Sequence, residues 1–246
     1  NVPGTVNAST VATITGIAAD INTAYASSGF SGLGDEAVTV TDTTVEASVL
    51  NTLNSNTTGL VTATSVATIN GTASAITTLI GNEGTSGDKV ALDTDFAMTV
   101  SSGSATVDQA NTMAAFSTSG AITATISNTD IAELDDLTTA SADQLTITVA
   151  STSATAAQLT TVAGATGLNV TATAVETVTG TATQMDALLA VEGSTGDKVN
   201  LDADYAITIN SGTATVTQAN AYATAAGVVT ATISNTDIAE LDDLTT

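Results

Sequence analysis

An internal repeat constrains the fold of this chain more than any other feature of its sequence. The seventeen residues TATISNTDIAELDDLTT occur at 123–139 and again at 230–246. The match is longer than this stretch, because residues 64–139 align with residues 172–246 at an offset of 108 or 109, which falls to 107 after a two-residue deletion near Phe116. Self-similarity at a fixed period indicates a repeat architecture.

A shorter unit lies inside this period. Eight segments alternate apolar residues with threonine, at spacings of 23, 36, 25, 24, 23, 37 and 23 residues. Alternation with period two and many β-branched residues predicts β-strands, with Val, Ile and Ala on one face and threonine on the other. The segments begin near Ala37, Leu60, Phe96, Ala121, Leu145, Leu168, Tyr205 and Val228.

Each predicted strand is followed by a turn and then by apolar residues at helical spacing. In SNTDIAELDDLTT, Asp130 and Glu133 lie in a first helical turn, where negative charge favours the helix dipole. The same stretch places Ile131, Leu134 and Leu137 on one helix face. The corresponding inward faces elsewhere are predicted to be Ala156, Leu159 and Val162; Val45, Val49 and Leu53; and Val216, Ala219 and Ala223.

A strand and a short helix in about 23 residues, repeated, predict an α/β solenoid. It would consist of a parallel β-sheet with short helices on one side, built from coils of about 23 residues and longer coils of about 36 residues. The longer coils begin near Thr5, Leu60 and Leu168 and add a second strand (VATIT, VATIN, VETVT) and a glycine-rich loop. The alternative is a strand-only parallel β-helix, in which the weak helices form a third edge.

The repeat predicts the domain organisation. Residues 1–246 are expected to form one continuous solenoid segment with a superrepeat of about 108 residues. Residues 60–167 would be one copy, 168–246 an incomplete second copy and 1–59 a partial copy, since VNASTVATITG near the start echoes VTATSVATING. The sequence shows no signal peptide and ends inside a repeat, so we expect a fragment of a longer protein.

The charge balance excludes several partners. Asp and Glu total 25, the only cations are Lys89 and Lys198, and the net charge is −23. Such a surface repels phosphate backbones and anionic lipid, so no nucleic acid is expected as a partner. No apolar run reaches the roughly twenty residues that a membrane span needs, so no membrane insertion is expected either.

The residue types available argue against an enzyme. His, Cys, Arg and Trp are absent, which removes the usual nucleophile–base pairs and the groups that stabilise acyl or phosphoryl transfer. We therefore predict no catalytic residues and no required cofactor, with Ca²⁺ as the one candidate.

Two glycine-rich loops, 84–95 (GTSGDKVALDTD) and 193–204 (GSTGDKVNLDAD), are the candidate calcium sites, and GLGDE at 32–36 is a reduced form. Ca²⁺ takes a shell of carboxylate and carbonyl oxygens, which such acidic loops offer. The alternative is that each Asp closes a glycine turn and each lysine pairs with a nearby acid. The candidate ligands are Asp88, Asp93 and Asp95 in the first loop and Asp197, Asp202 and Asp204 in the second.

The threonines of the predicted strands should project from one sheet face. A regular TxT array is similar to that of ice-binding solenoids, although Thr is also simply a favourable residue on a solvated strand. The array consists of Thr39/Thr41, Thr62/Thr64, Thr123/Thr125, Thr146/Thr148, Thr171/Thr173 and Thr230/Thr232, with single residues at Thr99 and Thr208.

The N-terminal stretch also carries a resemblance. VATITGIAADINTAYASSGFSGLGDEAVTVTDTTVEASVLNTLNSNTTG, with its GLGDE turn and VTVTDT strand, resembles the giant Thr/Ala/Asp-rich repeat proteins of marine cyanobacteria. Among these are very large cell-surface proteins associated with swimming motility. The resemblance implies an extracellular or cell-surface location, and it transfers no catalytic residue.

These observations predict a structural extracellular or cell-surface repeat protein that forms a stiff acidic rod or a head-to-tail filament, with a role in motility or adhesion. The expected partners are other copies of the same chain, bound head to tail or laterally, and components of the cell envelope. Two alternatives stay open: a calcium-stabilised adhesin or surface-layer component, and an ice-binding solenoid that uses the threonine array.

Overall fold

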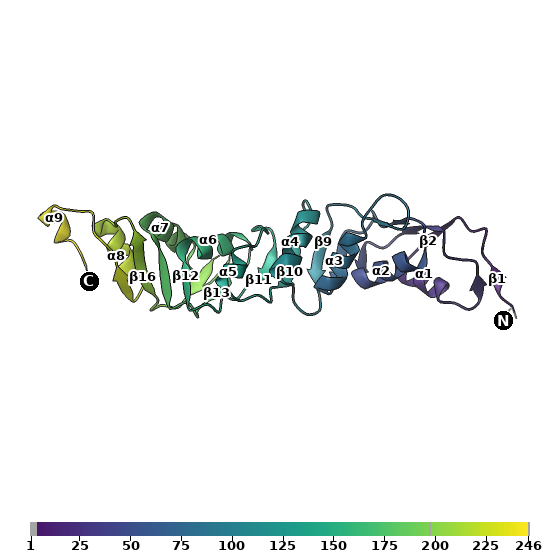
Figure 1. Cartoon of the computed structure of the whole chain (residues 1–246), viewed down its shortest axis with the longest axis horizontal. Helices are drawn as coiled ribbons and strands as arrows, with labels where there is room; N and C mark the ends of the chain where they lie inside the picture. Colours follow the sequence, from purple (N-terminus) through teal and green to yellow (C-terminus); the bar gives the residue numbers. More distant parts are fainter. Residues whose placement is uncertain (1–3, 197, 246) are drawn as a thin grey trace. The chain divides into compact units, whose positions relative to one another are not determined.

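The structure is a computed structural model that describes residues 4–196 and 198–245. The contacts within the chain divide it into two units, one ending at Ala124 and the other beginning at Thr125. Each unit is an α/β arrangement of parallel strands and short helices, and the described residues form nine helices in all (Figure 1). The predicted combination of parallel strands with short helices is confirmed, and the strand-only alternative is wrong.

Unit 1 contains three groups of parallel strands. The pair is β1 (Val6–Asn7) with β3 (Phe30–Ser31). The second group is, in order, β2 (Thr13–Gly16), β4 (Ala37–Val40), β6 (Val61–Thr62) and β8 (Val90–Ala91). The third is β5 (Thr44–Glu46), β7 (Thr68–Gly71), β9 (Ala97–Val100) and β10 (Ile122–Thr125), whose last residue is the first of unit 2.

The helices of unit 1 pack against one another in chain order. They are α1 (Ala18–Tyr25), α2 (Ala47–Asn56), α3 (Ala73–Gly81) and α4 (Val107–Phe116). Helix α2 lies between α1 and α3, and α3 lies between α2 and α4. Helix α2 also packs against β5 and β7, and α3 packs against β7, so these helices cover the strands as well as one another.

Unit 2 repeats this plan. One sheet is β12 (Ser153–Thr155), β14 (Thr177–Thr181), β16 (Ala206–Ser211) and β17 (Val228–Thr230), and β13 (Val170–Ala172) pairs with β15 (Val199–Leu201). Strand β11 (Gln144–Thr146) precedes them. The helices are α5 (Ile131–Leu134), α6 (Ala156–Gly164), α7 (Ala182–Val191), α8 (Val216–Ala225) and α9 (Ile238–Leu241).

The elements of the two units correspond at the offset that the sequence repeat gives. Helix α3 begins at Ala73 and α7 at Ala182, and α4 begins at Val107 and α8 at Val216, an offset of 109 in both cases. The pairing corresponds as well, since β7 pairs with β9 and the equivalent β14 pairs with β16. Similar sequence has therefore produced the same elements in the same order.

The longer coils differ from their predicted length. Val61 lies opposite Val90 in one sheet and Ile69 lies opposite Met98 in another, so successive layers are 29 residues apart here. The predicted spacing of 36, from Leu60 to Phe96, joined strands that belong to two different sheets. Alternation identifies a strand but not its partner, which is why the sequence merged the two sheets.

The core consists of many small apolar side chains. In β4, Val38 and Val40 are buried while the alternate residues are exposed, and β16 buries Ile207 and Ile209 between residues that are half-buried or exposed. The largest fully buried side chains include Tyr205, which lies next to β16. Alternating burial leaves threonine on the outer face of the strands, as the sequence predicts.

Threonine also fixes where several helices begin. The Thr106 hydroxyl accepts a hydrogen bond from the Gln109 backbone N–H at 3.2 Å, and the Gln109 side chain accepts from the Thr106 backbone N–H at 3.0 Å. This reciprocal capping box satisfies two amides that a helix start would otherwise leave open. The same Thr–Gln pair begins α6, α7 and α8.

A glycine follows several helices because the chain passes very close to the preceding coil. A Cβ on Gly120 would lie 1.9 Å from the Phe96 carbonyl oxygen, and one on Gly59 would lie 2.2 Å from that of Glu36. A buried hydroxyl holds the same crossing, since the Ser117 Oγ donates to the Phe96 carbonyl oxygen at 3.0 Å. Any side chain at these glycines would force the backbones apart.

Two predicted helix faces need correction. Helix α2 buries Ala47, Leu50 and Leu53, whereas the sequence pattern pointed to Val45, Val49 and Leu53. Val45 is buried in strand β5, so the helix begins later than its apolar spacing suggests. In α8 the third buried residue is Tyr222, and the predicted Ala223 is exposed.

Across the described part of the chain, no helix combines the length and apolar character needed to cross a membrane.

Candidate functional site

The candidate calcium ligands of the first loop are all on the surface. Asp88, Asp93 and Asp95 are exposed, and the Asp93 Oδ1 accepts a hydrogen bond from the backbone N–H of Thr94 at 2.7 Å. Gly87 next to Asp88 has a φ of +70°, which is the conformation of a tight glycine turn. The Asp93 carboxylate therefore bonds the backbone of its own loop.

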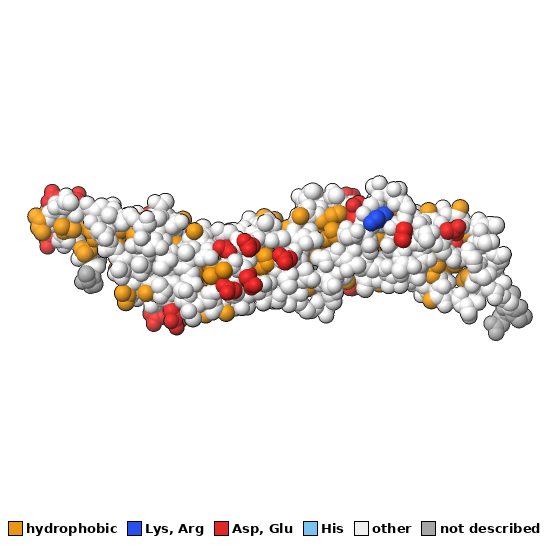
Figure 2. Space-filling view, viewed as in Figure 1, with side chains coloured by type: hydrophobic (Ala, Val, Ile, Leu, Met, Phe, Trp, Pro, Cys, Tyr) orange, Lys and Arg blue, Asp and Glu red, His pale blue; other side chains and the backbone are white. Residues whose placement is uncertain are grey.

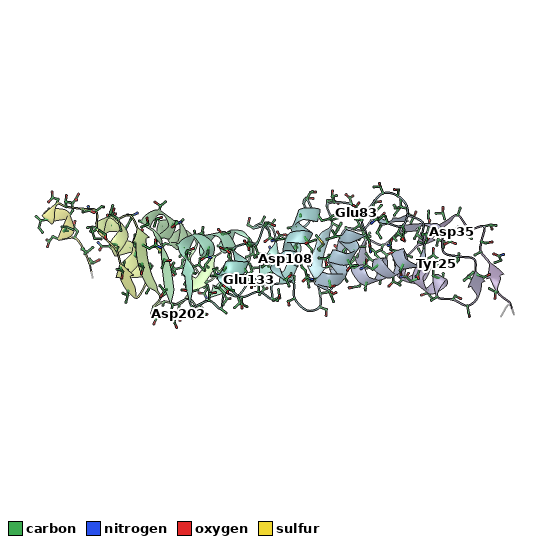
Figure 3. All side chains as sticks on the ribbon, viewed as in Figure 1. Tyr25, Asp35, Glu83, Asp108, Glu133 and Asp202 are labelled. Carbon is green, nitrogen blue, oxygen red and sulfur yellow. The ribbon has the colours of Figure 1, made fainter. Side chains whose placement is uncertain are left out.

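In the second loop, Asp202 and Asp204 line a surface hollow of about 380 Å³ together with Glu176. Asp202 is labelled in Figure 3 and is exposed, as is Asp204. Asp197 lies outside the described residues. Within the described residues no three acidic side chains come close enough to hold a metal ion, so the predicted calcium sites stay a prediction.

The lysine of the second loop has a structural contact. The Lys198 Nζ donates a hydrogen bond to the Ala190 carbonyl oxygen at 2.8 Å, near the end of helix α7. A cation at the C-terminal end of a helix is favourable because the last carbonyl groups carry partial negative charge. Lys198 therefore fastens its loop to the helix that precedes it.

Tyrosine hydroxyl groups bonded to carboxylates are a feature that sequence reasoning missed. Tyr205 donates to Glu192 Oε2 at 3.1 Å and Tyr222 donates to Asp186 Oδ1 at 2.8 Å. Burial and the neighbouring carboxylate raise the pKa of both phenols, and burial raises the pKa of Glu192, partly offset by the Tyr205 hydroxyl. The two residues are 13 positions apart in the Tyr205–Glu192 pair and 36 apart in the Tyr222–Asp186 pair, so no local sequence motif predicts either bond.

Unit 1 has one such pair, at the GLGDE turn. The Tyr25 hydroxyl donates to Glu36 Oε2 at 2.9 Å, and the Gly34 backbone N–H donates to the same oxygen at 2.8 Å. Burial, followed by the Glu36 hydrogen bond, raises the pKa of Tyr25 to about 12. Burial would raise the pKa of Glu36, but the N–H of Gly34 and the hydroxyl of Tyr25 outweigh it and lower that pKa.

Glu36 is only 1% exposed. Among the described residues, its Oε1 has no hydrogen-bond partner. Its backbone carbonyl oxygen accepts from the Thr57 hydroxyl at 2.7 Å, so the residue joins two successive coils. The arrangement is that of a structural carboxylate in a turn.

The predicted threonine array is exposed or half-buried throughout, as expected for an outer face. In unit 1, however, it is not one array. Thr39 and Thr62 belong to the sheet of β4 and β6, whereas Thr99 and Thr123 belong to that of β9 and β10. The outward-facing threonines of this unit therefore form two short rows.

Charge on the visible surface is acidic and dispersed. Figure 2 shows Asp and Glu side chains in several separate groups on one face, with few cationic atoms between them. Glu133 and Asp108, labelled in Figure 3, are both exposed. Repulsion between acidic groups favours solubility.

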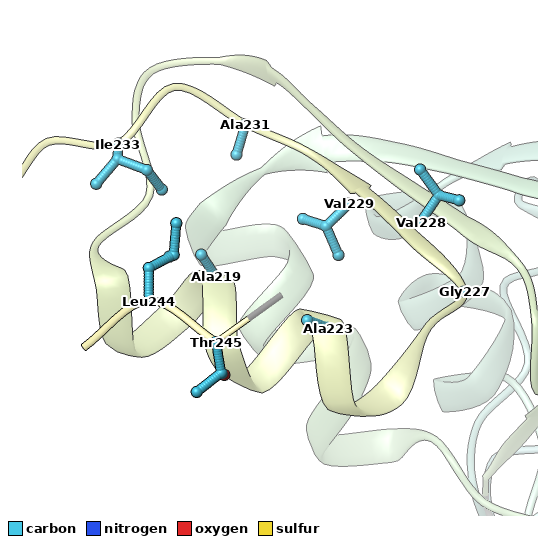
Figure 4. Close-up of a pocket in the computed structure, with 9 residues that line it drawn as sticks. All are labelled: Ala219, Ala223, Gly227, Val228, Val229, Ala231, Ile233, Leu244 and Thr245. Atoms are coloured by element: carbon cyan, nitrogen blue, oxygen red, sulfur yellow. The ribbon is translucent and has the colours of Figure 1, made fainter. Parts of the chain in front are cut away.

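An apolar surface lies at the end of unit 2, and we call it the C-terminal face. It surrounds a hollow of about 360 Å³ between helix α8 and the strand β17 with the residues after it. In Figure 4, Val229 and Ala231 point toward α8, from which Ala219 and Ala223 point back, and Leu244 closes one side. The lining is Ala219, Ala223, Gly227, Val228, Val229, Ala231, Ile233, Leu244 and Thr245.

Comparison of the chain with protein-family models, with curated proteins and with solved structures gave no match. The function must therefore be inferred from the fold and its surfaces.

Proposed function

We propose that this chain is a structural repeat segment of an extracellular or cell-surface protein, built as an α/β solenoid. The observation that carries the proposal is the recurrence of the same elements and the same parallel pairings at an offset of 109 residues. Stacked repeats of this kind bury only the faces that adjoin the next coil, and their usual product is an extended surface.

The surface chemistry supports a structural role. The chain has 25 acidic residues and only two lysines, which favours solubility in salt-rich surroundings where charge repulsion is screened. The buried polar groups tie coil to coil, as the Thr57 hydroxyl does at 2.7 Å from the Glu36 carbonyl oxygen. The buried polar groups therefore stabilise the packing of one coil on the next.

The resemblance to the surface repeat proteins of marine cyanobacteria adds the location and the role. On this proposal the chain belongs to a stiff acidic rod or filament at the cell surface that acts in motility or adhesion. Its partners would be further copies and components of the cell envelope.

Small-angle X-ray scattering of the 246-residue chain tests the architecture. A compact globule of this length has a radius of gyration of about 18 Å. One continuous solenoid predicts a clearly larger value and the scattering of an elongated particle. A radius of gyration at the compact value would refute the proposal.

A further inference from the structure

The two copies of TATISNTDIAELDDLTT differ in what covers them, and this difference identifies a docking surface. The inference rests on the repeat architecture proposed above and names the partner of the C-terminal face. In the first copy Ile131 and Leu137 are 5% and 6% exposed. In the second copy the equivalent Ile238 and Leu244 are 78% and 38% exposed.

The cover of the first copy is the coil formed by residues 140–168, which contains β11, β12 and α6. The Ile126 N–H donates to the Thr146 carbonyl oxygen at 3.0 Å, and the Ala150 N–H donates to the Thr129 carbonyl oxygen at 2.8 Å. Helix α5 also packs against α6. The first copy therefore continues both its backbone pairing and its apolar packing into this coil.

The start of helix α5 is completed by the same coil. The Ile131 N–H donates to the Ser151 Oγ at 3.0 Å, so a side chain of the covering coil satisfies one of the open amides of the helix start. The same arrangement joins other neighbours, since the Ala18 N–H donates to Asp42 Oδ2 and the Val216 N–H to Asn235 Oδ1. In these three places the covering coil brings a polar acceptor to the helix that it covers.

The second copy has the same local structure but none of these partners among the described residues. The Asp237 Oδ1 accepts from the Ala239 N–H at 3.0 Å, just as Asp130 accepts from Ala132 in the first copy. Its other side is anchored, because Thr245 N–H donates to Asn220 Oδ1 at 2.9 Å. The second copy is therefore folded and held against α8, and the side chains that the first copy buries, Ile238 and Leu244, are exposed.

We propose that the C-terminal face, together with Ile238, binds a strand–helix coil with the sequence pattern of residues 140–168. The partner would place a strand of the type LTITV beside residues 231–233 and a Ser or Asp hydrogen-bond acceptor beside the Ile238 N–H. A short helix with leucine or alanine on its inner face would cover Ile238. The proposed interface is equivalent to the one that residues 123–139 already make with residues 140–168, so residues 140–168 indicate which side chains the partner needs.

A second copy's N-terminal end is the competing occupant. Val6, Val11, Ile17 and Phe30 are 52%, 38%, 51% and 45% exposed there. That end, however, presents the upstream side of its coil, and its Val6–Gly16 stretch matches residues 61–71, which follow a coil of the 140–168 type in this chain. In the repeat, a coil of the 140–168 type therefore lies between a C-terminal end of this kind and an N-terminal end of this kind. For this reason we propose that coil, and not the N-terminal end itself, as the occupant.

The test attaches residues 140–168 after Thr246 of the full chain and follows amide hydrogen exchange of Ile238 by NMR. Docking predicts that Ile238 exchange slows at least tenfold toward the rate of Ile131, because tethering supplies a high effective concentration. A matched extension in which the copies of Leu145, Ile147 and Val149 are Asp should leave the exchange unchanged.

Unchanged Ile238 exchange with the native extension would overturn the inference. Slowing that the Asp-substituted extension reproduces would overturn it as well. Sedimentation velocity of the unextended chain tests the competing occupant, since self-association lost in both Ile238→Asp and Val6→Asp would assign the face to a second copy. An elongated chain in scattering with no docking would leave the proposed function standing, so the two failures are distinguishable.

Discussion

Residues 123–139 and 230–246 are identical in sequence and adopt the same cap and the same single-turn helix, yet their burial differs widely. Ile131 is 5% exposed and Ile238 is 78% exposed. The cap is local, since Asp130 and Asp237 each bind an amide two residues away. Burial comes from the next coil, which the first copy has and the second lacks among the described residues. The cap and the helix turn thus depend on neighbouring residues in the sequence, whereas burial depends on a distant segment that packs on them.

The largest expected effect is the difference between Ile131→Ala and Ile238→Ala. Truncation of a buried isoleucine costs about 2–5 kcal/mol because it removes transfer energy and leaves a cavity. At an exposed site the change stays within about 0.5 kcal/mol. Urea denaturation followed by circular dichroism measures both variants. Equal losses at the two sites would break the comparison.

Alanine in place of a glycine that passes close to the preceding coil should destabilise the chain more where the two backbones lie closer together. A Cβ on Gly120 would lie 1.9 Å from a backbone oxygen of Phe96, and one on the equivalent Gly227 would lie 2.7 Å from that of Asp204. Gly120→Ala should therefore destabilise the chain by about 1–3 kcal/mol, and Gly227→Ala by less.

Gly81→Ala is the matched control, because nothing lies within 4 Å of its Cβ position in the last turn of α3. It should stabilise the chain by up to about 1 kcal/mol, since alanine restricts the unfolded chain. Thermal melts of the three variants give the ranking. A loss for Gly81→Ala as large as that for Gly120→Ala would contradict the crossing as its cause.

Tyr205 occupies the position that Phe96 has in the first copy, and its hydroxyl adds a group that can titrate. The pKa of Tyr205 is raised in the folded chain, so above pH 10 the unfolded state releases a proton that the folded state keeps. Stability should therefore fall as the pH rises above 10, and Tyr205→Phe should make the fall shallower. Melting temperatures from pH 8 to 11 measure the slopes. Parallel slopes for the two chains would show that the buried phenol has no such role.

The smallest expected effect is that of calcium. Asp202 and Asp204 share their hollow with Glu176, whereas the equivalent of Glu176 in the first copy is Ala67. A saturated site would contribute about 2.7 kcal/mol at one hundred times its Kd, which is a shift in Tm of about 5–10 °C. Since no three acidic side chains of the described residues come close enough to hold a metal ion, we expect Ca²⁺ and EDTA to leave the Tm unchanged. A shift of that size that Asp202→Asn removes would restore the metal site.

Much of the fold could be predicted from local patterns. The repeat offset, the strands and the inward face of Ile131, Leu134 and Leu137 all follow from alternation and helical spacing, and the structure buries all three. The start of helix α2 was mispredicted because Val45 and Val49 are spaced like a helix face, whereas Val45 ends up in a strand.

The rest depends on contacts between distant residues. Which strands share a sheet is decided by pairing between coils, so the threonines of unit 1 looked like one array and are two. The Tyr205–Glu192 bond and the buried Glu36 likewise depend on how one coil lies on the next. The candidate metal ligands are close in sequence, but closeness in sequence does not fix where the carboxylates point, and no three acidic side chains of the described residues come close enough to hold a metal ion.

Amide hydrogen exchange at Ile131 and Ile238 in the unmodified chain tests whether the next coil, and not the local sequence, protects the start of this helix. Identical neighbours on both sides give the two amides the same intrinsic exchange rate, so any difference reports structure alone. We expect much slower exchange at Ile131, whose N–H is bonded to Ser151 Oγ beneath the next coil. Equal rates at the two amides would contradict this expectation.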